Sequence, residues 1–373
     1  MRGSIISTMA AGSVLLAAVL AGCSGASEPD GPTVIVVGDV VPVLSEDDYR
    51  VTGSIAAQLD GRAATFQGWT AGGDEIYVRE AHSADGGSGY DPYAVALVAR
   101  DPGTGGTEVL SDRARRQGPV DRDAIPGSAL QLGPVTVDGD RLLWVESPSR
   151  DHGDLHVLDL GDGTDRLLAT RSVSVLSRPV VVGDDAWFIA SDAKDPESIP
   201  RMSSLYRVPL DASAPPQRVA EGATDVFADV GGKVRVLIGD RLIGWDPSLG
   251  AEGRMPGDGL AGTSFAASEG VSAVLDPEAH EIRIDSDLGD HRIDAGDGSL
   301  GALNATDRWV AFAVERNGEQ QAHLLDLRRG ELRRLADAPV PSSARFEDHQ
   351  YALGTASGRL PTTFPLIELG PAD

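Results

Sequence analysis

Cysteine and lysine are almost absent from this sequence of 373 residues. It has one cysteine, Cys23, and its only lysines are Lys194 and Lys233, so nearly all of its basic side chains are arginines. One cysteine cannot build an internal disulfide framework or a zinc site made of several thiolates. With 32 basic and 57 acidic residues, the formal net charge is −25. Binding to a phosphate backbone needs a basic surface, so this charge argues against a nucleic-acid partner.

The patterns of common active sites are missing as well. There is no Gly-x-Ser-x-Gly elbow, and the histidines are scattered without His-x-x-x-His or His-x-His spacing. The turns at 159–163 and 294–299 lack the dense oxygen ligands and the distal Glu of a calcium loop. The pair Asp184-Asp185 suits glycoside hydrolysis in principle, but in so acidic a chain it carries little information. We therefore expect no catalytic residue, no metal and no cofactor.

Long amphipathic helical patterns are also absent. No long stretch has an apolar period of 3.6 residues, and 54–59 has room for at most a turn or two of helix. The 45 glycines and 23 prolines suit many turns between short strands. These features favour an all-β chain.

One phrase recurs along most of the sequence: an acidic or glycine turn, a spacer, and then a run of apolar residues. Its copies are spaced by about 40–50 residues, which is the period of a propeller with several short strands in each blade. The copies lie at 74–78, 140–145, 184–189, 232–237, 270–275, 307–312 and 348–353.

We interpret this phrase as the second strand of a four-stranded blade, followed by a third and a fourth strand. Alternating segments separated by Gly, Asp or Pro turns follow most copies, as expected for half-buried strands. The predicted third and fourth strands are 94–99 and 107–110, 154–160 and 165–170, 204–210 and 217–220, 242–245, 281–284 and 292–293, 322–327 and 332–335, and 364–369.

The last unit lacks a fourth strand of its own. We expect the apolar segment 33–37 to supply it, because a propeller must close its ring to protect the edges of its end blades. The sequence thus predicts one β-propeller domain over 33–373, with seven four-stranded blades closed by an N-terminal strand. Six blades is the alternative if the leanest unit is not a blade.

Several aromatic residues and histidines recur at matching places in the repeats, and we expect them to have structural roles. Trp144, Trp187 and Trp309 lie in copies of the phrase, and we expect them in the core between blades rather than on a sugar-binding platform. His156 and His323 occupy matching places in the third strands of two blades, which indicates repeat architecture.

The N-terminus carries an export pattern. Residues 1–22 contain one charge, Arg2, and a short apolar run, as in a secretory signal peptide. The run ends Leu20-Ala21-Gly22-Cys23, and here the sequence resembles a bacterial lipoprotein, whose lipobox has Leu, Ala or Ser, Gly or Ala, and Cys at these places. The alternative is an ordinary secretory signal that contains a cysteine by chance.

The resemblance implies cleavage before Cys23 and acylation of its sulfur, with palmitate-type chains holding the protein to a membrane. Residues 23–32 contain no large apolar side chain beyond the cysteine and are expected to form a flexible tether. The resemblance places the mature chain on the outer face of the cell membrane, or in the outer membrane if the cell has one, since Ser24 and not Asp follows the cysteine.

Over about residues 65–370, the period and the order of strands resemble WD40-like and TolB-like propellers of exported bacterial proteins. The Gly-His and Trp-Asp dipeptides of true WD40 repeats do not recur, since Trp245-Asp246 is a single instance. The resemblance therefore implies a fold and transfers no functional residue.

Long connections gather in the first three units, after the second strand (81–92, 147–153 and 192–203) and between the first two units (113–128). In propellers these connections emerge on one face, and loops on a rigid scaffold often bind ligands. Tolerated insertions are the alternative explanation. A cluster of arginines in this acidic chain would suit a carboxylate or phosphate. The candidate ligand or partner residues are His82, Tyr90, Arg113, Arg115, Arg116, Arg122, Arg150, His152 and Arg201.

The sequence predicts a monomeric, lipid-anchored module that binds an envelope protein or glycan through this loop-rich face. An extracytoplasmic hydrolase or lyase with its site in a central channel is the alternative, because catalytic groups from separate blades leave no motif in the sequence.

Overall fold

A computed structural model describes most of the chain beyond residue 31. The chain divides after that residue, and residues 32–373 form one compact unit. The described residues are 32–38, 40–45, 49–84, 91, 94–112, 131–149, 152–171, 177–191, 203–229, 233–239, 241–246, 251–252, 262, 264–268, 270–276, 278–335, 350–352 and 363–369. Within these ranges there is no helix with the length and hydropathy needed to cross a bilayer.

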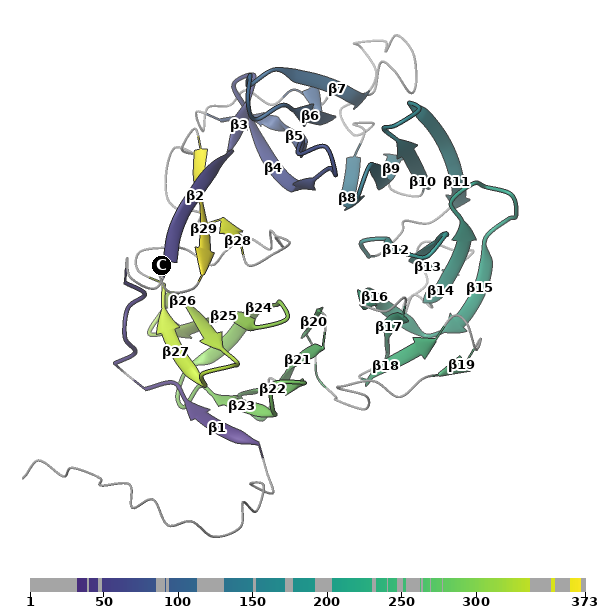
Figure 1. The fold of residues 1–373 in the computed structure, drawn as a ribbon. Helices are drawn as coiled ribbons and strands as arrows, with labels where there is room; N and C mark the ends of the chain where they lie inside the picture. Colours follow the sequence, from purple (N-terminus) through teal and green to yellow (C-terminus); the bar gives the residue numbers. More distant parts are fainter. Residues whose placement is uncertain are drawn as a thin grey trace, which may run out of the picture. The chain divides into compact units, whose positions relative to one another are not determined.

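The described residues form β-sheets, which we number I to VII in chain order (Figure 1). Sheet I comprises β3 (Gln58–Leu59), β4 (Arg62–Trp69), β5 (Glu75–Ser83), β6 (Ala96–Arg100) and β7 (Thr107–Asp112). Sheet II comprises β8 (Gln131–Asp138), β9 (Arg141–Ser149), β10 (His152–Asp159) and β11 (Thr164–Arg171). Sheet III comprises β12 (Val180–Val182), β13 (Asp185–Ser191), β14 (Ser203–Pro209) and β15 (Gln217–Glu221).

The later sheets follow the same plan. Sheet IV comprises β16 (Ala223–Asp229), β17 (Lys233–Ile238), β18 (Arg241–Asp246) and β19 (Ala251–Glu252). Sheet V comprises β20 (Ser264–Ser268), β21 (Val271–Asp276), β22 (Glu281–Ser286) and β23 (His291–Asp294), with β1 (Thr33–Val36) at its edge. Sheet VI comprises β24 (Ser299–Ala305), β25 (Trp309–Arg316), β26 (Glu319–Asp326) and β27 (Glu331–Arg334). Sheet VII comprises β28 (Gln350–Ala352), β29 (Thr363–Leu369) and β2 (Tyr49–Ala56).

The predicted order of strands within each repeat is confirmed. The recurring phrase forms β5, β9, β13, β17, β21 and β25, each of which follows a first strand and pairs antiparallel with the strand after it. Its last copy forms β28, which pairs with β29. The predicted third and fourth strands are also present, so the described part of the chain is all-β, as expected.

Apolar clusters lie between sheets that are neighbours in the chain. One joins sheets I and II, another II and III, a third III and IV, and a fourth V and VI. Trp144 and Trp187 are 0% and 1% exposed in these clusters, and Trp309 is 6% exposed in a cluster shared by sheets I, VI and VII. The prediction that these tryptophans pack between sheets is confirmed.

The matching histidines belong to the same architecture. His156 lies opposite Trp144 and His323 lies opposite Phe312, and each ring stacks on its partner with centroids 5.3 and 5.5 Å apart. Phe188 and Tyr206 make the equivalent pair in sheet III, and their centroids are 5.6 Å apart. A repeated aromatic pair across the second and third strands therefore explains these histidines.

The prediction that residues 33–37 complete the last sheet is wrong. Strand β1 pairs in parallel with β23 and so extends sheet V. Strand β2 joins the last sheet instead, antiparallel to β29, with Ile55 3% exposed and Ala56 7% exposed in the shared cluster. Because of this pairing, residues 54–56 are in a strand and do not form the short helix that was considered for 54–59. The apolar sequence of 33–37 correctly predicted a strand. It did not predict the partner of that strand, which is the free edge of β23.

Residues 33–56 cross three sheets in succession, and we call them the N-terminal strap. After β1, Val43 bridges to Arg334 at the end of sheet VI, and the amide of Leu44 donates to the carbonyl of Arg334 at 2.8 Å. Arg316 of β25 donates to the carbonyls of Val37 and Gly38. The strap therefore links sheets V, VI and VII through backbone hydrogen bonds.

Candidate functional site

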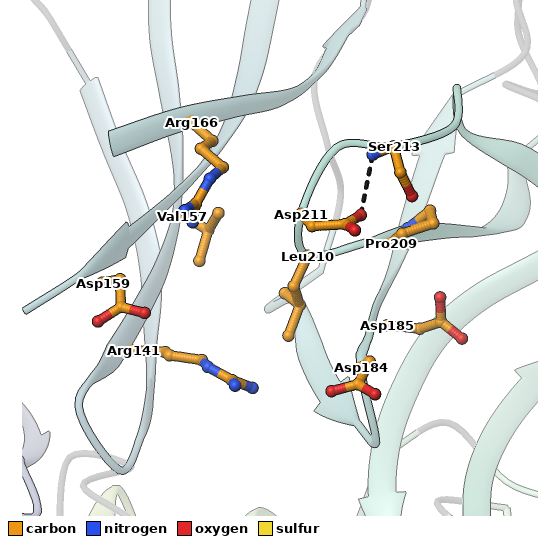
Figure 2. Close-up of a pocket in the computed structure, with 10 residues that line it drawn as sticks. All are labelled: Arg141, Val157, Asp159, Arg166, Asp184, Asp185, Pro209, Leu210, Asp211 and Ser213. Atoms are coloured by element: carbon orange, nitrogen blue, oxygen red, sulfur yellow. Dashed lines mark hydrogen bonds between the residues drawn. The ribbon is translucent and has the colours of Figure 1, made fainter. Parts of the chain in front are cut away.

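A hollow of about 310 Å³ lies between sheets II and III (Figure 2). Its walls come from strand ends: the start of β9 and the end of β10 on one side, and the start of β13 and the end of β14 on the other. The lining residues are Arg141, Val157, Asp159, Arg166, Asp184, Asp185, Pro209, Leu210, Asp211 and Ser213.

Two short hairpin loops place the acidic residues and the arginine at its rim. Asp138 pairs with Arg141 and Val182 pairs with Asp185, which leaves two-residue loops that begin with Gly139 and Gly183. These glycines have φ of 58° and 63°, a conformation that costs glycine little. The acidic turn of the recurring phrase is thus a hairpin loop, and the hollow is lined by Arg141, directly after one copy, and by Asp184 and Asp185 of the next copy.

The two walls carry opposite charges. Both lining arginines, Arg141 and Arg166, come from sheet II together with Asp159, whereas the sheet III side supplies only acidic charges: Asp184, Asp185 and Asp211. Figure 2 shows Arg141 pointing into the space toward Asp184. Between the walls lies an aliphatic base of Val157, 1% exposed, and Leu210, 7% exposed. The hollow thus offers charged hydrogen-bonding groups around an apolar base, an arrangement that suits binding.

The carboxylates on sheet III are held by local contacts. Asp211 accepts a hydrogen bond from the amide of Ser213 at 2.9 Å. Hydrogen bonds from the Ser213 side chain and backbone lower the pKa of Asp211, and the charge of Arg166 on the opposite wall adds a small effect. Asp185 lies 3.7 Å from Arg207 in an ion pair. These contacts fix the positions of both carboxylates at the rim of the hollow.

Three of the described histidines contact oxygen atoms of their own sheets. His156 lies 3.4 Å from Asp165, and the rings of His291 and His323 contact the carbonyls of Gly289 and Gln321. Burial lowers the pKa of His323 and so favours its neutral form. Across the ranges that the structure describes, no group of three or more His, Cys, Asp or Glu residues is placed to hold a metal ion.

Most of the predicted ligand residues lie outside the described residues. His82 is exposed on β5, and the backbone of His152 begins β10. Neither of these two residues lines the hollow. Tyr90, Arg113, Arg115, Arg116, Arg122, Arg150 and Arg201 lie outside the described ranges, as does Cys23.

The hollow also lies at the opposite strand ends from the predicted loops. Antiparallel strands alternate their connections between the two ends of a sheet, so the connections after β5, β9 and β13 leave from the other end. The prediction of a long connection at 147–153 is wrong, because β9 continues to Ser149 and pairs there with His152 of β10. Sequence reasoning missed the hollow, although Asp184-Asp185 was considered for its acidity. The signal that was available is the repetition of an acidic hairpin loop in two neighbouring units.

Comparison with known proteins identifies the fold and not a family. No protein-family model matches the chain, and no curated protein matches it. Among solved structures, it is similar to a prolyl endopeptidase at 15% identity and a TM-score of 0.52, covering 84% of this chain and 44% of that one. It is also similar to the β-propeller domain of the Trilobed protease from Pyrococcus furiosus, at 11% identity and a TM-score of 0.50, covering 84% and 94%.

A third similar structure is the extracellular domain of a putative one component system from B. thetaiotaomicron. The identity is 10% and the TM-score is 0.52, with 87% of this chain and 42% of that chain covered. The chain thus spans less than half the length of two of these three structures. At such low identity the likeness shows the fold alone, and that fold is a β-propeller.

Proposed function

We propose that this chain is a lipid-anchored extracytoplasmic β-propeller that binds an envelope protein or glycan. The observation that carries the binding role is the hollow between sheets II and III, where charged groups from two rigid sheets surround an aliphatic base. Such sites hold a polar group by pre-placed partners. With a formal charge of −25, the chain favours a partner other than nucleic acid and remains soluble as a monomer.

The proposal includes a TolB-like ring of seven blades, one for each sheet. Strand β2 would act as the closing strand, because it joins the N-terminal part of the chain to β29. The cluster shared by sheets I, VI and VII supports this arrangement, since it places residues of the first and last units in one core. Closure of this kind would shield the end blades from edge pairing.

The binding role can be tested by capture from solubilised membranes. One variant removes residues 85–90 and 113–128, which lie within the predicted loops and outside β5, and a second replaces Asp184, Asp185 and Asp211 by Asn. We expect each to lose partners that the wild type captures. The matched control replaces the exposed Glu108, Glu278 and Glu319 by Gln, which changes the net charge equally away from the hollow. Unchanged capture by both variants would count against the role.

The anchor gives a separate prediction. Replacing Cys23 by Ala removes the sulfur that would carry the lipid, so the protein should leave the membrane fraction and appear in the medium or periplasm. Two acyl chains hold a protein far better than one, so release should be nearly complete. Fractionation with blotting measures it, and Ser24→Ala is the control. Continued membrane association of the Cys23→Ala protein would oppose the lipid anchor.

A hydrolase or lyase remains the second candidate, because a prolyl endopeptidase is among the similar structures. The chain spans 44% of that protein, so the likeness transfers no activity. Incubating the purified protein with peptide and ester substrates tests this alternative. Turnover that survives further purification would favour an enzyme over a binding module.

A further inference from the structure

Two opposite charges face each other across the hollow without meeting. Arg141 begins β9 on sheet II, and Asp184 lies in the hairpin loop that precedes β13 on sheet III. The guanidinium is directed toward the carboxylate (Figure 2). Among the described residues, neither side chain takes part in a hydrogen bond or an ion pair. The two walls thus present complementary charges with open space between them.

The nearest carboxylate of its own sheet does not satisfy Arg141 either. Asp159 lies directly opposite Arg141 in the register of β9 and β10, where oppositely charged side chains often pair across strands. The Asp159 carboxylate instead accepts a hydrogen bond from the amide of Gly161 at 2.9 Å. Arg141 therefore extends into the hollow and away from this neighbour.

Sheet VI shows how this protein satisfies an arginine within one sheet. Asp326 is the third residue after His323, as Asp159 is the third residue after His156. Arg308, immediately before β25, donates to both oxygens of Asp326, at 3.2 and 2.6 Å. The corresponding carboxylate in sheet II has no such partner among the described residues, although an arginine lies opposite it. The open arrangement is therefore particular to the sheet that borders the hollow.

The charge of the walls limits the ligands that fit. By formal charge, the lining residues of sheet II carry two arginines and one aspartate, a net of +1, whereas those of sheet III carry three aspartates, a net of −3. In the described ranges no group of three or more His, Cys, Asp or Glu residues is placed to hold a metal ion. A positive group that lies against sheet III is therefore an organic cation, and a negative group belongs at sheet II.

The base and the size of the hollow add two further limits. Val157 and Leu210 form an aliphatic base between the charged walls, which suits an aliphatic ligand body. The volume of about 310 Å³ is near the lower end for small-molecule sites, so it suits a small ligand better than a polymer chain. Arg141 and Asp184 also stand at a hairpin and a strand start, so their backbones lose little freedom on binding.

We infer that the hollow binds a small zwitterion with an aliphatic body, of the kind that an aliphatic α-amino acid represents. The carboxylate of the ligand accepts from Arg141, and its ammonium donates to Asp184, so that the ligand completes the ion pairs that the protein leaves open. The aliphatic part rests on Val157 and Leu210. The inference rests on the proposed binding role and names the ligand class of the same hollow.

Calorimetric titration of the full-length protein with three related probes tests the need for both charges. The probes are L-leucine, isoamylamine, which lacks the carboxylate, and isocaproate, which lacks the ammonium. At low ionic strength, leucine should bind about fivefold more tightly than either analogue, or better, because each lost charged contact weakens binding. Equal binding of leucine and one analogue would overturn the inference, as would the absence of leucine binding.

Two variants assign the charges to their walls. Arg141→Gln should weaken leucine about fivefold or more and leave isoamylamine unchanged, because that analogue has no carboxylate to lose. Asp184→Asn should weaken leucine and leave isocaproate unchanged. Arg328→Gln, in an exposed turn of sheet VI, and Asp74→Asn, immediately before β5, are the matched controls and should bind as the wild type does. A variant that weakens all three probes equally, or none, would overturn the assignment.

Melting temperatures separate a ligand-binding arginine from a structural one. Arg141→Gln should melt within about 1 °C of the wild type, because no contact within the described part of the chain is lost. Arg308→Gln should melt a few degrees lower, because it leaves the buried Asp326 without its partner. Equal losses in the two variants would show that Arg141 is structural and would overturn its role.

Partner capture distinguishes this inference from the proposed function. If leucine binds and Arg141→Gln loses that binding while it still captures the wild-type partners, the zwitterion site is supported and the partner binds elsewhere. If leucine does not bind but the variant with Asp184, Asp185 and Asp211 replaced by Asn loses its partners, the binding role is supported and the zwitterion is overturned.

Discussion

Replacing the inward-facing strap residues Val37 and Leu44 by serine is expected to lower the free energy of unfolding by about 4 kcal/mol or more. Removing a large buried apolar side chain costs about 2–5 kcal/mol, and a buried hydroxyl adds to that cost. Val37 is 2% exposed and packs between sheets V and VI, whereas Leu44 is 9% exposed in the cluster shared by sheets I, VI and VII. Urea unfolding of the purified double variant measures the loss.

The strap also contains its own control. Val34 and Val36 alternate with the inward side chains and are 55% and 62% exposed. Replacing both by serine changes the same strap by similar chemistry, but it should shift the free energy by no more than about 0.5 kcal/mol per site. Equal losses for the inward and outward pairs would contradict the packing of the strap.

The pairing of the strap's two strands was not predicted correctly from the sequence. Segment 33–37 reads as a buried strand, yet two of its valines face solvent, because β1 adds to an outer sheet edge. Strand β2 has a largely polar sequence and was assigned no strand, although it pairs along its length with β29. Pairing between distant segments depends on which edge is free, and local apolar patterns do not record that.

The second, third and fourth strands could be predicted because each alternates or is apolar and ends at a turn. The first strands were not predicted. β20 reads Ser-Phe-Ala-Ala-Ser and β24 reads Ser-Leu-Gly-Ala-Leu-Asn-Ala, so small and polar residues replace the bulky run that marks a strand. Their strand form comes from pairing with β21 and β25.

The binding groups were harder to predict than the fold. The hollow assembles side chains from two sheets, and in a chain with 57 acidic residues no single Asp stands out. Which of them meet depends on how the two sheets pack, and that arrangement exists only once the chain has folded.

Replacing Tyr77 by Phe is expected to destabilise the protein by about 1–3 kcal/mol, the usual cost of leaving buried hydrogen-bonding groups without a partner. Tyr77 is fully buried; its hydroxyl accepts from the amide of Ala56 at 2.8 Å and donates to Glu75 at 2.8 Å. Glu75 also accepts from Arg100 at 2.5 Å. The network joins the end of β2 to β5 and β6, so its loss should loosen the junction between sheets VII and I.

The same network predicts how stability depends on pH. Burial first, and then the charge of Glu75, raises the pKa of Tyr77 well above its ordinary value near 10. The folded state thus keeps a proton that the unfolded chain releases above about pH 10. The contribution of Tyr77 is therefore complete below pH 10 and declines as the pH rises, by up to about 1.4 kcal/mol per pH unit.

Urea unfolding between neutral pH and pH 11 measures this decline. The wild type should lose stability above pH 10, and the Tyr77→Phe protein, which starts lower, should lose less over the same interval because it has no phenol to ionise there. Tyr49→Phe on β2 leaves the Ala56–Tyr77–Glu75 network intact and should keep the wild-type slope. Parallel curves for wild type and Tyr77→Phe would mean that other groups cause the alkaline loss and that this junction does not govern it.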